Sequence, residues 1–303
     1  MPQSKTETES TNARQTPYEF VFGAETFEET LFPGIRDEIE ERGSEPADPE
    51  QFIFLTSVGK LLRMIAGDAE PAAVAGSGRE ATRRAADAAE ARDAADTAVR
   101  EHGHLLFHAY NFWRRGRQLF LLEQDAVAAV LGTAVPEDVE SVRAPHSAGY
   151  LQLPPHRFWA RAAEGRQPEA VDGVFWTATH PHADARARLD LLLVLGMRPD
   201  RAGFSVVPVG AALGSGEDGW VADARPGGED FANTLPGGEL EDLVSLETRA
   251  EALKLMVLWF RYLEAHPEAL GSVERNGPDA RPASPHALPP SGLEYRRVRG
   301  VTG

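Results

Sequence analysis

Two histidines and an aspartate alternate along one short stretch of the chain, at His180, His182 and Asp184. They follow directly on the apolar residues 174–177, a pattern that predicts the end of a strand. Side chains at alternate positions of an extended segment point to one side, so these three can converge on one metal ion. A zinc ion held in this way lowers the pKa of a bound water and makes it a nucleophile.

The run 179–184 resembles the zinc motif of the metallo-β-lactamase-like hydrolases, in which His-x-His-x-Asp follows a strand. This resemblance implies a metal-dependent hydrolase with zinc as the cofactor and His180, His182 and Asp184 as ligands. The family continues with a histidine or polar residue and then glycines, where this chain has Ala-Arg-Ala. The resemblance is confined to these six residues, and a polar loop between two strands is the alternative interpretation.

A second group of polar residues recurs at helical spacing. Each member is three or four positions from the next, so on a helix they form one continuous stripe: Glu101, His104, His108, Asn111 and Arg115. The two imidazoles are candidates for a third zinc ligand, although Leu105 stands where the HExxH motif requires glutamate. The simpler interpretation is a solvated or partner-facing stripe, which most amphipathic helices carry.

Other catalytic machinery is absent from the sequence. The chain has no cysteine, which excludes thiolate nucleophiles and disulfides. It also lacks the Gly-x-Ser-x-Gly motif of a nucleophile elbow, the Walker A motif and the dinucleotide-binding glycine pattern. No complete catalytic site can therefore be assembled from sequence motifs alone.

The composition indicates a soluble acidic protein. Of 303 residues, 42% are hydrophobic and 26% charged, and the net charge is −16. Acidic residues outnumber basic ones 13 to 5 in residues 1–60 and 9 to 1 in residues 214–247. Such a charge repels nucleic acid and anionic membranes, so we expect neither as a partner. The polar N-terminus does not resemble a signal peptide, which favours a cytoplasmic location.

The periodicity predicts an α+β fold. Helices are expected at 49–66, at 79–115 with a weak point at Gly103, and from 240 or 245 to 265. Strands are expected at 118–122, 150–153, 174–179, 189–195 and 204–209. Because no helix-length segment separates the last three strands, we predict an antiparallel sheet. Two core helices, 105–113 and 240–265, would cover one face of it.

The same signals predict the domain organisation. Residues 1–16 are expected to be disordered, residues 17–275 to form one domain, and residues 276–303 to form a loose tail with a possible last strand at 293–295. Within the domain, 17–100 is a helical extension and 101–275 the core. The extension is expected to contain a short strand at 18–22 and a helical turn at 27–32. The predicted core residues are Leu106, Trp113, Leu153, Phe175, Leu192, Val206, Met256 and Phe260.

Our functional hypothesis is a non-catalytic accessory protein without a cofactor, which binds another macromolecule, most simply a protein. The candidate contact residues are Arg114, Arg115, Arg117 and Trp220. The acidic N-terminus, the acidic stretch 213–239 and the histidine- and arginine-bearing stripe are the contact surfaces that this hypothesis predicts. The alternative is the zinc-dependent hydrolase. The two are distinguished by whether the histidine stripe and the His-x-His-x-Asp cluster face each other in space.

Overall fold

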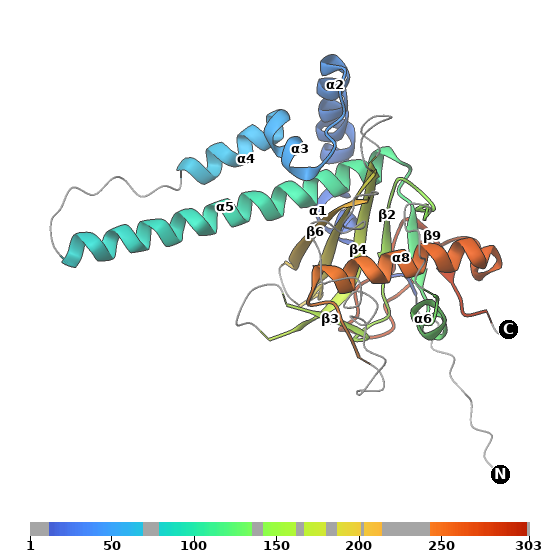
Figure 1. Ribbon diagram of the computed structural model, residues 1–303. Helices are drawn as coiled ribbons and strands as arrows, with labels where there is room; N and C mark the ends of the chain where they lie inside the picture. Colours follow the sequence, from blue (N-terminus) through green and yellow to red (C-terminus); the bar gives the residue numbers. More distant parts are fainter. Residues whose placement is uncertain are drawn as a thin grey trace, which may run out of the picture.

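A mostly antiparallel sheet of nine strands forms the centre of the molecule, and helices pack against it (Figure 1). The computed structural model describes residues 12–68, 79–134, 142–161, 167–179, 187–200, 203–213 and 243–301. The predicted α+β class is confirmed. In the described part of the chain, no helix combines the length and the apolar character needed to cross a membrane.

The strands follow the order β6-β5-β4-β2-β1-β9-β8, with β3 pairing to both β4 and β7. Their bounds are β1 Leu119–Leu122, β2 Ala148–Gln152, β3 Phe158–Ala160, β4 Glu169–Thr179, β5 Ala187–Leu195, β6 Ser205–Leu213, β7 Val244–Ser245, β8 Leu270–Arg275 and β9 Glu294–Val298. The meander β4-β5-β6 is antiparallel, as predicted. β1, however, is parallel to β2 and β9, because α6 (Gln124–Leu131) carries the chain back between β1 and β2.

The C-terminal segment is an integral part of this sheet. β9 lies between β1 and β8 and pairs with both, and Tyr295 and Val298 are buried. Leu288 is buried as well. The expectation of a loose tail is therefore wrong for these residues, because the strand completes its hydrogen bonds with a neighbour far away in the sequence.

The helices are α1 Pro17–Phe22, η1 Phe27–Leu31, α2 Phe32–Arg42, α3 Pro49–Leu55, α4 Ser57–Asp68, α5 Arg79–Arg114, α6, α8 Arg249–Ala265 and η3 Pro267–Ala269. The strand expected at 18–22 is instead α1. Thr16 caps this helix by accepting a hydrogen bond from the Glu19 backbone, and the Glu19 side chain accepts one from Thr16 in return. The turn expected to end at Pro33 continues as α2, because a proline fits the first turn of a helix.

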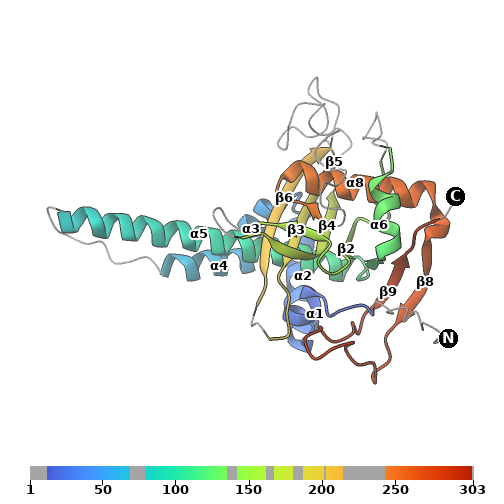
Figure 2. The same cartoon turned by 90° about the horizontal axis from the view of Figure 1, so that it is seen from below.

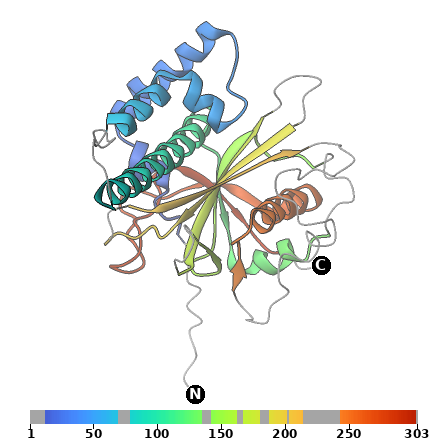
Figure 3. The same ribbon diagram turned by 60° about the vertical axis from the view of Figure 1, so that its left-hand side comes forward.

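The two core helices lie on opposite faces of the sheet, not on one face (Figure 3). Leu119 and Leu121 of β1 pack in the cluster that contains α5, whereas Phe120 and Leu122 pack in the cluster that contains α8. Side chains alternate across a strand, so apolar residues at successive positions require a cover on each face. Of the predicted core residues, all are buried except Trp113, which is half-buried.

α5 extends well beyond the sheet, and α4 runs beside the extended part (Figures 1 and 2). The predicted helix 49–66 is broken at Thr56, where the backbone becomes extended. α5 passes through Gly103 without a break. A β-carbon at Gly103 would lie 2.1 Å from Cδ1 of Ile53, so the glycine lets α3 approach α5 closely.

Candidate functional site

The predicted histidine stripe faces the sheet and is not solvated. His104, His108 and Asn111 are 8%, 1% and 9% exposed, and they lie on the part of α5 that packs against strands β4 and β5. The simpler interpretation of the stripe as a solvated or partner-facing surface is therefore wrong for these three residues. They lie inward because α5 also buries the aromatic residues next to them in the sequence.

His108 forms a hydrogen bond with β4. Its Nδ1 atom lies 3.0 Å from Oγ1 of Thr177, and both groups are buried. Burial holds the pKa of His108 well below its usual range, and the neighbouring His104 lowers this pKa further. The imidazole is therefore neutral at pH 7. Within the described residues, Nε2 of His108 and Nδ1 of His104 have no hydrogen-bonding partner.

A buried carboxylate lies on the neighbouring strand. Asp190 is 1% exposed, and both of its carboxylate oxygens accept hydrogen bonds from Nε of Arg188, at 3.0 and 2.8 Å. Burial raises the pKa of Asp190 to about 6, although Arg188 lowers it in part. Burial, together with the nearby Arg100 and Arg188, lowers the pKa of His104 to about 4.

A cavity of about 660 Å³ opens at this end of β4. Asn111 and Arg115 of the stripe line it together with Thr177 and Thr179, opposite the residues 43–47. Thr179 donates a hydrogen bond to the backbone carbonyl of Ala47, at 2.8 Å. The stripe and the end of β4 that leads into the His-x-His-x-Asp run therefore meet in space.

His180, His182 and Asp184 themselves lie outside the described residues. In the part of the chain that is described, no three histidine, aspartate or glutamate side chains are grouped so that they could hold a metal ion. His104 and His108 alone offer two ligands. Zinc sites with catalytic activity use three protein ligands, so the third would have to come from residues 180–184.

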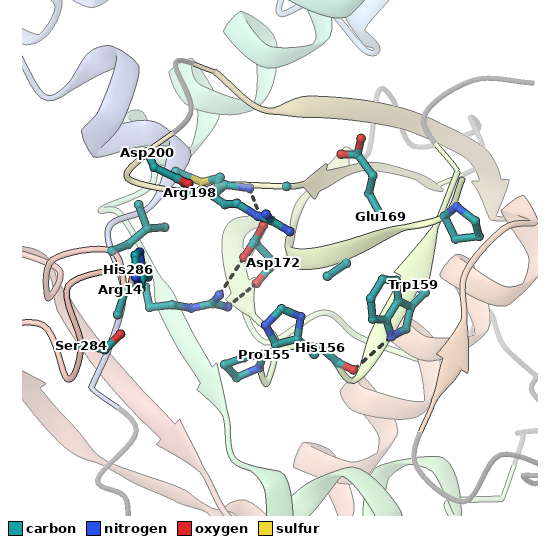
Figure 4. Close-up of a pocket in the computed structure, with 16 residues that line it drawn as sticks. Arg14, Pro155, His156, Trp159, Glu169, Asp172, Arg198, Asp200, Ser284 and His286 are labelled. Atoms are coloured by element: carbon teal, nitrogen blue, oxygen red, sulfur yellow. Dashed lines mark hydrogen bonds and ion pairs between the residues drawn. The ribbon is translucent and has the colours of Figure 1, made fainter. Parts of the chain in front are cut away.

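A larger cavity of about 720 Å³ lies at the other end of β4 (Figure 4). Its walls come from segments distant in sequence: the N-terminal segment, the turn after β2, β3, the start of β4, the β5–β6 hairpin and residues 284–288. At its base Arg14 donates a hydrogen bond to the Asp172 carboxylate, at 2.7 Å, and the Met197 backbone N–H donates another, also at 2.7 Å. Burial raises the pKa of Asp172, against the opposing effect of Arg14.

One wall of the larger cavity is aromatic. Trp159 is half-buried, and its Nε1 donates a hydrogen bond of 3.0 Å to the backbone carbonyl of His156 (Figure 4). The His156 backbone is left-handed, with φ of 58°, and its exposed ring lies 6.2 Å from the Trp159 ring. The hydrogen bond from the indole thus stabilises the left-handed backbone of His156, a conformation that is sterically unfavourable for residues with a β-carbon. Arg198 and Asp200 are exposed on the opposite side.

The arginines expected to contact a partner form ion pairs within the chain. Arg114 and Arg115 both pair with Glu45, the latter at 3.5 Å, and Arg117 pairs with Glu28 at 2.8 Å. These pairs attach the loop between α2 and α3 and the η1 turn to the end of α5. Trp220 and residues 214–239 of the acidic stretch lie outside the described residues.

Five residues of these two sites were not predicted from the sequence: Arg14, His156, Trp159, Asp172 and Asp190. Only the two aspartates carry a signal in the sequence, because each interrupts an apolar strand where a charge is normally excluded. Arg14 lies in a stretch that composition alone assigns to a disordered tail. The cavity that it lines is visible only once the segments are assembled.

Comparison with known proteins adds little to this description. No protein family model matches the chain, and no curated protein matches it. Among solved structures, the crystal structure of AcrVA2 is similar with a TM-score of 0.45 and 12% sequence identity, over 93% of this chain and 81% of that chain.

Proposed function

We propose that this chain is a non-catalytic binding protein that holds a segment of a partner protein in the cavity around Trp159. The observation that carries the proposal is the cavity of about 720 Å³. A large pocket with a few converging polar groups is the default position for a binding site.

The residue types around the cavity favour a protein segment. Trp159 and Arg198 belong to the two residue types that most often dominate the binding energy of protein interfaces, and both retain exposed surface here. Arg14 and Asp172 neutralise each other at the base. The exposed rim carries both signs of charge, with Arg198 and Asp200 two residues apart. A peptide backbone with mixed polar side chains matches this lining better than a highly charged ligand.

The test is to place a photoreactive amino acid at position 284, an exposed position on the rim of the cavity, and irradiate the protein in an extract of its source cells. We expect one discrete crosslinked protein, which disappears when unlabelled wild-type chain is added in excess. The same unlabelled chain carrying Trp159→Ala should compete at least about 10-fold less well, the effect of losing one aromatic hot-spot residue. Unlabelled Val273→Ala, altered on β8 at a half-exposed position, serves as the matched control.

Trp159→Ala also removes the hydrogen bond to His156, so a second variant separates binding from folding. Arg198→Glu changes an exposed side chain and should leave the thermal midpoint unchanged while it weakens competition. Equal competition by both variants and the wild-type chain would remove the cavity as the binding site.

The zinc-dependent hydrolase remains a second candidate because of one observation. His104 and His108 are buried, their pKa values are lowered, and they lie beside the strand end that precedes His180. Neutral imidazoles are the form that binds zinc. Elemental analysis for zinc distinguishes this candidate from the binding protein.

A further inference from the structure

An exposed apolar patch lies on α4. Leu61, Met64 and Ile65 are 54%, 64% and 60% exposed, and we call these three residues the arm patch. Leu61, Met64 and Ile65 share one face of α4 because they are three and four positions apart.

We propose that the arm patch binds the arm patch of a second copy of this chain, so that α4 and the outer part of α5 from each copy form a four-helix bundle. A two-fold contact of this kind uses the same surface on both copies. This inference is independent of the proposed function, since the cavity around Trp159 lies among the strands and not on the arm.

The distribution of charge favours a second copy. The arm helices, residues 57–68 and 79–100, contain seven basic and six acidic residues, whereas the whole chain has a net charge of −16. The excess of acid is therefore carried entirely by the rest of the molecule. Two copies repel each other through their bodies but not through their arms, so the arm is the surface where they can approach at least electrostatic cost.

The patch has the size of a small contact surface. Each of its side chains presents on the order of 150–200 Å² when fully exposed, so the exposed fractions leave roughly 300 Å² of apolar surface on each copy. The largest apolar patch on a typical monomer is about 300–600 Å² and is often a functional surface.

The shape of the molecule allows this contact. The outer part of α5 and the adjacent α4 extend away from the sheet, so two arms can overlap along their length while the bodies stay apart (Figures 1 and 2). A hairpin of two helices with one uncovered apolar stripe corresponds to half of such a bundle. The arm of a second copy offers an apolar surface of the same shape and length.

The first test measures the mass of the full chain by analytical ultracentrifugation. We expect about twice the single-chain mass of 32.9 kDa at a concentration of about 10 µM, a typical affinity range for an interface of this size. Raising the salt concentration should strengthen the dimer, because it screens the repulsion between acidic bodies. Met64→Glu should reduce the mass to that of one chain, whereas Val273→Glu, a charge placed at another half-exposed apolar position, should not.

The second test uses the absence of cysteine from the chain. A single Met64→Cys should form a disulfide-linked dimer under mild oxidation, and Val273→Cys should form no disulfide link between the two copies under the same conditions. Both positions are exposed, so neither change affects the core. A wild-type chain that stays monomeric at about 100 µM would overturn the proposal. The arm patch would then belong to the surface that contacts a different protein.

Discussion

The hydrogen bond between Nδ1 of His108 and Oγ1 of Thr177, 3.0 Å long and fully buried, joins α5 to β4 three residues before His180. It turns the polar stripe of α5 toward the end of the strand from which the His-x-His-x-Asp run departs. His108 is therefore a neighbour of the last described residues of β4. A zinc ion bound by His108 could therefore take a further ligand from the residues that follow β4, which zinc analysis tests.

Zinc content separates the two candidate functions. As a binding protein, the chain purified without a His-tag should contain no stoichiometric zinc, and a chelator should leave its thermal midpoint unchanged. The hydrolase alternative requires about one zinc per chain, lost in His182→Ala and retained in His286→Ala, because a catalytic zinc needs three protein ligands. His286 lies on the cavity at the opposite end of β4 and is the matched control.

The pH dependence of stability should reveal two opposing titrations. The pKa of Asp190 is about 6 in the folded protein, above the value near 3.9 of an unfolded aspartate, so the free energy of unfolding falls as the pH rises between them. The pKa of His104 is about 4, below the usual 6.5, so over the same range it makes the free energy of unfolding rise. In the wild-type chain these contributions oppose each other.

Single substitutions expose each contribution. Asp190→Asn should make denaturant stability rise more steeply from pH 4 to pH 6, by up to about 1.4 kcal/mol per pH unit. His104→Gln should shift the slope in the opposite direction. Urea titrations at several pH values measure both slopes. If the two variants have the same slope as the wild-type chain, the assigned pKa shifts are wrong.

Phe260→Ala should destabilise the fold by about 3–5 kcal/mol, as large-to-small changes in a well-packed core do. The side chain is 3% exposed, and its ring lies 5.2 Å from that of Trp259 and 6.1 Å from that of Trp176. Chemical denaturation gives the loss directly. Val273→Ala, at a residue that is 48% exposed, should cost less than about 1 kcal/mol. A similar small loss for Phe260→Ala would place α8 outside the core.

Gly103→Ala should destabilise the protein although alanine is the better helix former. Its β-carbon would lie 2.1 Å from Cδ1 of Ile53, and overpacking costs about 1–3 kcal/mol against a gain of about 1 kcal/mol in helix propensity. The double variant with Ile53→Ala removes the clash. Its measured loss should therefore be smaller than the sum of the two single losses. Additive losses would show that α3 does not press against α5 at this glycine.

The N-terminal boundary of the fold should lie near residue 12. Ala13 is fully buried, and the Gln15 backbone N–H donates a hydrogen bond of 2.7 Å to the carbonyl of Pro289. Deleting residues 2–11 should leave the thermal midpoint within a few degrees. Deleting residues 2–16 should lower it sharply, because it also leaves the buried Asp172 without Arg14, a loss of about 3–5 kcal/mol for a buried pair. Equal midpoints for the two deletions would contradict this boundary.

The elements that were predicted correctly are those whose pattern lies within a short stretch of sequence. The meander β4-β5-β6 and the helices α5 and α8 were predictable because each has a continuous period or apolar run, and short connections set the antiparallel pairing. The strand predicted at 18–22 failed for a local reason. Its aromatic residues suggested a strand, but the cap formed by Thr16 and Glu19 favours a helix.

The sequence by itself determined the α+β class, most of the core residues and the presence of two polar groups on a helix and at a strand end. Only the tertiary structure decided that the stripe is buried against β4, that β9 enters the sheet, and that Arg14 reaches Asp172. Each of these depends on partners more than 60 positions apart in the chain. Local periodicity carries no information about such partners, since burial and pairing are properties of the assembled surfaces.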